Sequence, residues 1–146
     1  MPSDHTPPAV TPTAPWRPTS VWVERAETEA PVARRVLSRL ASVPVHVVDH
    51  SGAADAGARF VDGKRRLVIK RQGGSFLHHC PAGTPGLVCC NYLILNLAVN
   101  CPFDCGYCFL QDYVANNPAL KVFTNPEDGL AAVSYTHLTL PTTILV

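Results

Sequence analysis

Three cysteines within eight residues constrain this chain more than any other feature. The stretch reads Cys101-Pro-Phe-Asp-Cys105-Gly-Tyr-Cys108, a spacing that lets three thiolates converge on one centre from a single tight loop. Pro102 fixes one backbone angle of that loop, and Gly106 permits a left-handed turn that a bulkier residue would resist. Thiolates select soft metals, so the candidate centres are an iron–sulfur cluster and zinc.

The number of ligands bears on the choice between these two metals. A structural zinc site is closed by four protein ligands, whereas a reactive metal centre keeps one position open, and the loop supplies only three. Upstream residues can in principle close a zinc site or form a second one. We favour the alternative, that the upstream cysteines are small buried hydrophobes, because adjacent cysteines on a strand point to opposite faces. These upstream residues are His78, His79, Cys80, Cys89 and Cys90.

Composition limits the class of protein. The chain has 146 residues, enough for one domain and part of a second, and its net charge of +1 gives no general attraction to nucleic acid or membrane. No run approaches the ~20 apolar residues of a membrane helix, and the start lacks the regions of a signal peptide. The cysteines cluster between Cys80 and Cys108, which suits metal binding in a reducing compartment. We therefore expect a cytoplasmic protein with no membrane partner.

The first half of the chain is predicted to contain a β-α-β unit. Residues 1–20 hold six of the fourteen prolines and are expected to be a disordered lead, with Trp16 and Trp22 packing at its end. Strands are predicted at 21–24 and 43–48, with a helix at 27–41 between them. His46, within the second strand, is expected to be a packed or edge histidine. These elements belong to an N-terminal α/β region over residues 21–75.

Residues 59–71 carry six of the twelve basic residues of the chain. Asp62-Gly63 is predicted to be a turn and residues 65–70 a strand. One interpretation is a patch that contacts phosphate groups. The other, which the sequence alone favours, is an edge strand kept soluble by its charge.

The second half, residues 76–133, is predicted to begin a barrel. A buried strand is expected at 89–97, then the cysteine loop, a helix at 109–115, a strand at 120–124 and a helix that starts with Asn125 as cap and Pro126 in its first turn. This order is typical of a β/α barrel whose active loop follows its first strand. The predicted fold class is thus α/β: a small N-terminal β-α-β unit followed by the first strands and helices of an incomplete (β/α) barrel.

Residues 134–146 contain no Asp, Glu, Lys or Arg and show no helical period. They look like translated sequencing-adapter sequence, so we expect a non-native tail and a truncated reading frame.

Several short pieces beyond the cysteine loop form a family pattern. With the aromatic residue before the last cysteine, they make the chain resemble radical S-adenosylmethionine enzymes, and among these the spore photoproduct lyase-like (DNA repair photolyase-like) branch. The resemblance runs from about Val21 to Leu130, and Ala82 departs from the Cys-Pro-Gly-Thr run of that branch. The pieces are Cys80-Pro, Gly83-Thr84, Cys89-Cys90, Tyr92 and Cys108-Phe-Leu-Gln111 followed by Tyr113.

The resemblance implies a specific chemistry. Cys101, Cys105 and Cys108 would hold three irons of a 4Fe–4S cluster, and the fourth iron would chelate S-adenosylmethionine. Tyr107 would lie near the adenine, while Phe103 and Phe109 are expected to pack. An electron from reduced flavodoxin or ferredoxin would then cleave the cofactor to a 5′-deoxyadenosyl radical. In spore photoproduct lyase the substrate is a cross-linked thymine pair in DNA, so the implied activity is a radical lyase reaction in DNA repair.

Catalytic residues other than ligands are not identified, and Asn125 is only a positional candidate for the S-adenosylmethionine site. A barrel of ~250 residues is not closed by two strands, so we expect this polypeptide alone to be inactive. The alternatives are a non-catalytic zinc or iron–sulfur nucleic-acid-binding module that uses residues 59–71, and a radical enzyme with another substrate.

Overall fold

The computed structural model describes residues 16–54, 59–79, 93–103 and 105–137. The predictions for residues 1–15, Cys80, Cys89, Cys90 and residues 138–146 lie outside these ranges. In chain order the elements are β1 (Ser20–Glu24), the 3-10 turn η1 (Arg25–Glu27), α1 (Pro31–Arg39), β2 (Val45–Val48), the 3-10 turn η2 (Ser51–Ala54), α2 (Phe60–Gly63), β3 (Arg66–Lys70), β4 (Leu77–His79), β5 (Leu93–Leu95), β6 (Ala98–Val99), α3 (Leu110–Val114), β7 (Leu120–Phe123) and α4 (Pro126–His137).

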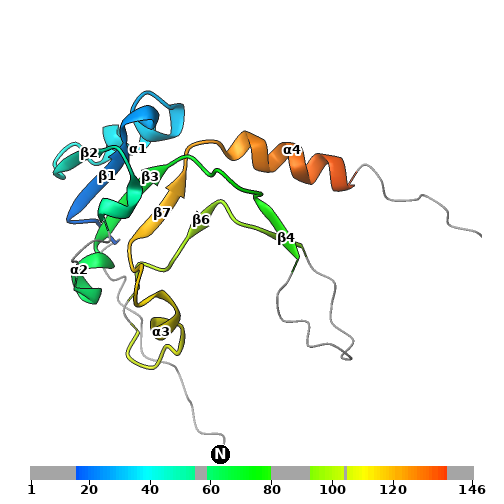
Figure 1. The fold of residues 1–146 in the computed structure, drawn as a ribbon. Helices are drawn as coiled ribbons and strands as arrows, with labels where there is room; N and C mark the ends of the chain where they lie inside the picture. The colour runs from blue at the N-terminus through cyan, green and yellow to red at the C-terminus, as the bar shows by residue number, and fades with distance from the viewer. Residues whose placement is uncertain (1–15, 55–58, 80–92, 104, 138–146) are drawn as a thin grey trace, which may run out of the picture.

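One five-stranded sheet organises the described chain, with the order β2-β1-β3-β7-β6 (Figure 1). The strands β2, β1, β3 and β7 are parallel, and β6 pairs with β7 antiparallel. The predicted β-α-β unit is β1–α1–β2, so this unit and the α/β class are confirmed. Because β7 pairs with β3, a single sheet joins the two regions 21–75 and 76–133 that the sequence analysis separated.

Apolar side chains cover both faces of the sheet, as expected of parallel strands. On one face α1 packs through Ala33 against Val21, Val23 and Ile69, and Trp16 contacts the same cluster. The helix starts at Pro31, whose missing N–H costs nothing in the first turn.

On the other face Trp22 packs beside Val68 and Ala54. The predicted packing of Trp16 and Trp22 is therefore confirmed. His46 lies on the edge strand β2 and stacks on Trp22 with ring centroids 4.6 Å apart, as the sequence analysis expected of an edge histidine.

The basic stretch 59–71 does contain the predicted strand, β3, but the prediction of an edge strand is wrong. β3 lies between β1 and β7, and its three middle residues, 67–69, are buried. The charges lie at or just beyond its ends. Arg66 lies over the Trp22 ring and donates to the Ala54 carbonyl, and Arg71 forms an exposed ion pair with Asp128 at 3.0 Å. The predicted turn at Asp62-Gly63 is the end of the short helix α2.

The strand predicted at 89–97 differs from expectation in its described part. Within that described part the structure has only the short strand β5, and β6 begins after its end. The strand is not buried, since Leu93 is 45% and Ile94 37% exposed. The reason is that β5 pairs only with β4, in a separate two-stranded sheet. The next helix and strand, α3 and β7, agree with the prediction.

The last described helix, α4, begins as predicted, with Asn125 before it and Pro126 as its first residue. It then continues to His137, four residues into the segment 134–146 that was expected to be a non-native tail. That this segment is non-native remains a prediction. Nothing in the described ranges forms a helix long and apolar enough to cross a membrane.

Candidate metal centre

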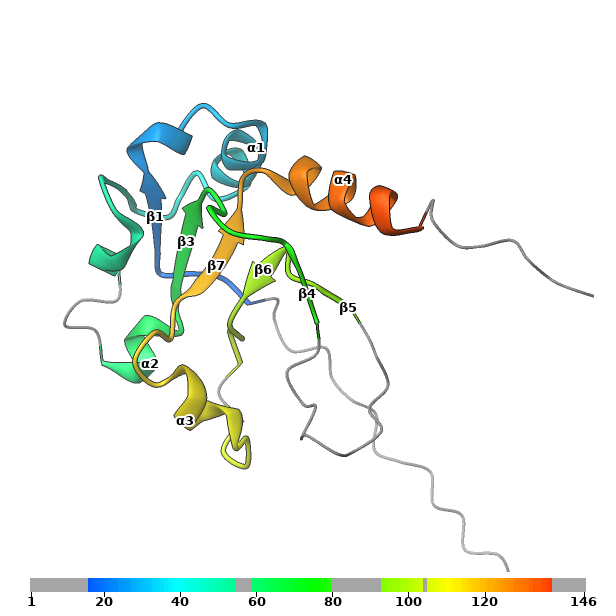
Figure 2. The same ribbon diagram turned by 45° about the vertical axis from the view of Figure 1, so that its right-hand side comes forward.

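The cysteine loop joins β6 to α3 and lies at one end of the sheet. Because β6 is antiparallel to β7, the loop lies where β3 and β7 begin, beside α2 (Figure 2). From the sequence, the loop was expected at the carboxyl end of a first barrel strand. It does follow β6, but it is at the opposite end of the sheet from the carboxyl ends of the parallel strands, where α4 starts.

Asn100 sets the direction of the chain as it enters the loop. Its φ of 73° lies in the left-handed region, which asparagine tolerates better than most residues. Its side-chain amide donates to the Ala119 carbonyl at 2.8 Å and also to the Asn117 carbonyl. The start of the loop is therefore tied to the segment that enters β7.

Lys64 binds the backbone of the next part of the loop, at Cys101 and Phe103. It follows α2 and is only 4% exposed. Its ammonium group donates to the Phe103 carbonyl at 2.6 Å and to the Cys101 carbonyl at 3.3 Å, and it lies 5.1 Å from the ring of Phe60. These contacts fix the loop backbone, and none of them involves the Cys101 thiol.

Gln111 of α3 holds the far end of the loop. Its side-chain amide donates to the Cys105 carbonyl at 2.6 Å, and its backbone N–H donates to the Cys108 carbonyl at 3.2 Å. The Cys108 N–H in turn donates to the Cys105 carbonyl at 3.0 Å, which makes a turn between these two cysteines.

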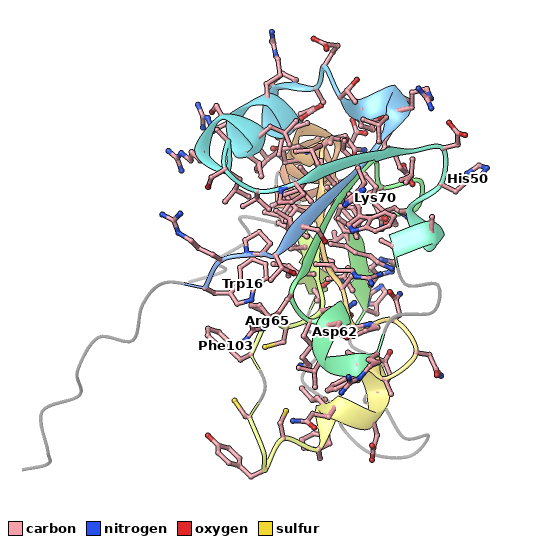
Figure 3. The ribbon with its side chains drawn as sticks, turned by 90° about the vertical axis from the view of Figure 1, so that its left-hand side faces the viewer. Trp16, His50, Asp62, Arg65, Lys70 and Phe103 are labelled. Carbon is pink, nitrogen blue, oxygen red and sulfur yellow. The ribbon has the colours of Figure 1, made fainter. Side chains whose placement is uncertain are left out.

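All three cysteines are free thiols and line one pocket of about 300 Å³. Cys101 is exposed, and Cys105 and Cys108 are half-buried. The described residues contain no group of three His, Cys, Asp or Glu side chains at metal-binding separation, so the thiols share a pocket but do not yet meet at one point. In Figure 3 the sulfur atoms lie along the loop near the labelled Phe103. The other lining residues are Lys64, Val99, Asn100, Phe103, Leu110, Gln111, Tyr113 and Val114.

The donor set suits a soft metal. Three cysteine thiols line one largely apolar pocket, and the backbone of their loop is hydrogen-bonded to Lys64 and Gln111. Thiolates are the ligands that soft metals prefer. A tetrahedral zinc site needs a fourth protein ligand. The two described upstream candidates, His78 and His79, are exposed on β4, outside this pocket. The three thiols that line the pocket fit an iron–sulfur cluster that has three protein ligands.

The aromatic residues of the loop are more exposed than expected. Phe103 is 62% and Phe109 84% exposed, so the prediction that both pack is wrong for the described chain. Tyr107, the predicted cofactor contact, is 93% exposed and is not among the lining residues. Because the loop and the short helix α3 project beyond the sheet, no described element covers these rings. The role of Tyr107 remains a prediction.

Three residues that hold the loop were not predicted from the sequence. Lys64 was noted only as one of the basic residues in 59–71, and Gln111 only as a position in the family pattern. Asn100 was not considered. A usable signal was present for Asn100 and Gln111, which flank the three cysteines. Asn125, the positional candidate, is 2% exposed, and its amide bonds to the backbone of Gln72 and to Asp128, away from the pocket.

Replacing Asn100 by alanine is expected to lower the free energy of unfolding by about 2 kcal/mol, because it removes two hydrogen bonds and leaves a left-handed residue without a side-chain partner. Asn100→Gly, which accepts the same φ, should lose about half as much. Urea denaturation of the metal-free chain measures both values. Unfolding free energies equal to that of the unsubstituted chain would show that the loop is held in another way.

No family model and no curated protein sequence matches this chain. Solved structures of spore photoproduct lyase do share its fold. The complex with dinucleoside spore photoproduct has a TM-score of 0.69 at 20% identity, over 88% of this chain and 38% of that one. A mutant with bound AdoMet and dinucleoside spore photoproduct has a TM-score of 0.69 at 21% identity, with the same coverage. The resemblance found in the sequence is thus confirmed at the level of fold, and the chain spans 38% of the length of these enzymes.

Proposed function

We propose, from the fold shared with spore photoproduct lyase and from the cysteine pocket, that this chain is the N-terminal part of a radical S-adenosylmethionine enzyme. The observation that carries the proposal is the set of three free thiols that line one pocket. The backbone of their loop accepts hydrogen bonds from Lys64 and Gln111, and Asn100 ties the start of the loop to the segment that enters β7. In this proposal Cys101, Cys105 and Cys108 hold three irons of a 4Fe–4S cluster.

The described residues position the three thiols and form the lining of the pocket around them. Three thiolate ligands leave one iron without a protein ligand, which is the open position that S-adenosylmethionine needs. When bound, the cluster and S-adenosylmethionine would supply a 5′-deoxyadenosyl radical that abstracts hydrogen from substrate. Val99, Leu110 and Val114 contribute apolar lining to the pocket. Apolar residues around a metal centre limit the access of solvent to it. Tyr107 is proposed to contact the adenine.

The proposed substrate is a thymine photoproduct in DNA, which a lyase-type radical reaction would restore to two thymines. The support is chemical analogy with the structures that share the fold, whose names include a dinucleoside spore photoproduct and AdoMet. Because the chain spans 38% of those proteins, this activity belongs to the whole enzyme. Reduced flavodoxin or ferredoxin is the proposed electron donor.

Electron paramagnetic resonance of the reconstituted, reduced chain tests this proposal. S-adenosylmethionine is expected to change the spectrum of the cluster, because its amino and carboxylate groups would occupy the open iron. Methylthioadenosine, which lacks both groups, is the control and should leave the spectrum unchanged. A spectrum indifferent to S-adenosylmethionine would contradict the proposed cofactor.

A further inference from the structure

The residue with the most unusual environment beside the cysteine pocket is Lys64. Lysine is almost never fully buried without an acidic partner. Lys64 is 4% exposed, and no ion pair of Lys64 is found among the described side chains. The acceptors around its ammonium group are two backbone carbonyls, of Cys101 and Phe103.

Close packing of the preceding residue, Gly63, against Pro118 fixes the position of this lysine. A Cβ atom on Gly63 would lie 2.2 Å from the ring of Pro118, so α2 approaches the entry of β7 more closely than any side chain allows. Pro118 lies between Asn117 and Ala119, whose carbonyls bind Asn100. The lysine and the start of the cysteine loop are therefore held by the same short segment.

The free-energy cost of burying this positive charge is offset if a negative charge lies close to it. Carbonyl dipoles alone compensate an ammonium group only in part. A cluster bound by three thiolates carries net negative charge, and it gains one more unit when it is reduced. Lys64 lines the same pocket as the three thiols, so its charge would lie near such a cluster in a medium of low dielectric constant.

We propose that Lys64 is a positioning residue that also sets the reduction potential of the centre. Its hydrogen bonds hold the backbone at Cys101 and Phe103, and its charge stabilises the reduced, more negative state of the cluster. This inference depends on the proposed function, because it needs a cluster on the three cysteines.

A redox titration of the full chain, reconstituted without oxygen and followed by paramagnetic resonance, tests the inference. Lys64→Gln keeps a donor for the carbonyls but removes the charge, and is expected to lower the midpoint potential and to speed iron release to a chelator about tenfold. Lys64→Arg keeps the charge and should stay near the unsubstituted protein in both measurements.

Lys70→Gln is the matched control, because it removes a positive charge at the opposite end of β3 from the loop (Figure 3). It should leave the potential unchanged. Equal potentials for Lys64→Gln and the unsubstituted protein would overturn the inference, as would loss of the cluster in both Lys64 variants, which would indicate a purely steric role. Failure of the unsubstituted chain to bind iron is a separate result, seen before any substitution, and it contradicts the proposed function itself.

Discussion

Alanine in place of Cys105 is expected to abolish assembly of the cluster, with iron content falling from about four atoms per chain to nearly none. A cluster with three protein ligands has no ligand to spare, and Cys105 is central to the loop because its carbonyl accepts hydrogen bonds from both Gln111 and Cys108. The substitution leaves those backbone bonds in place. The fold should therefore remain while the metal is lost.

Iron analysis and the absorption spectrum of the reconstituted chain measure this effect, and circular dichroism monitors the fold. The same loss is expected for Cys101→Ala and Cys108→Ala. Cys89→Ala is the matched control, since this cysteine lies outside the triplet and should not change the iron content. Retention of iron by Cys105→Ala would mean that the ligands are other residues.

The second large effect is expected at Asn125, whose replacement by alanine should lower the free energy of unfolding by about 3 kcal/mol. This side chain is 2% exposed. Its oxygen accepts from the Gln72 N–H at 2.9 Å, and its amide nitrogen donates to the Gln72 carbonyl at 3.2 Å and to Asp128 at 2.6 Å. It thus joins the end of β3 to the start of α4.

Alanine would leave the Gln72 backbone groups without these partners in a partly buried position, which is where lost hydrogen bonds are most costly. Urea denaturation of the metal-free chain measures the change. Asn116→Ala is the control, because Asn116 is exposed and its replacement should stay within about 0.5 kcal/mol. Equal stability of the two variants would show that the contacts of Asn125 contribute little.

The fold was predictable where local pattern determines structure. Apolar spacing located β1, α1 and β2, and the Asn125-Pro126 pair located the start of α4. The place of β3 in the sheet was not predictable, because six basic residues suggested an edge. The structure resolves this by placing charges at the strand ends and Leu67, Val68 and Ile69 in the interior. Nor does any local pattern specify that β6 is antiparallel to β7.

The residues of the candidate site were likewise only partly predictable from the sequence. Spacing alone singled out Cys101, Cys105 and Cys108, which the structure places around one pocket, because these residues share a single loop. Lys64 could not be found in this way, since it is 37 residues from Cys101 and reaches the loop only through the packing of α2. The exposure of Phe103 and Phe109 was also missed, because an aromatic residue in a sequence does not reveal whether another element covers it.

The most direct test of a cluster on the three cysteines is metal and sulfide analysis of the full chain after reconstitution without oxygen, with iron and zinc both supplied. We expect about four irons and about four sulfides per chain. One zinc per chain without sulfide would contradict this expectation, because the three cysteines would then belong to a closed structural site with no open position for S-adenosylmethionine.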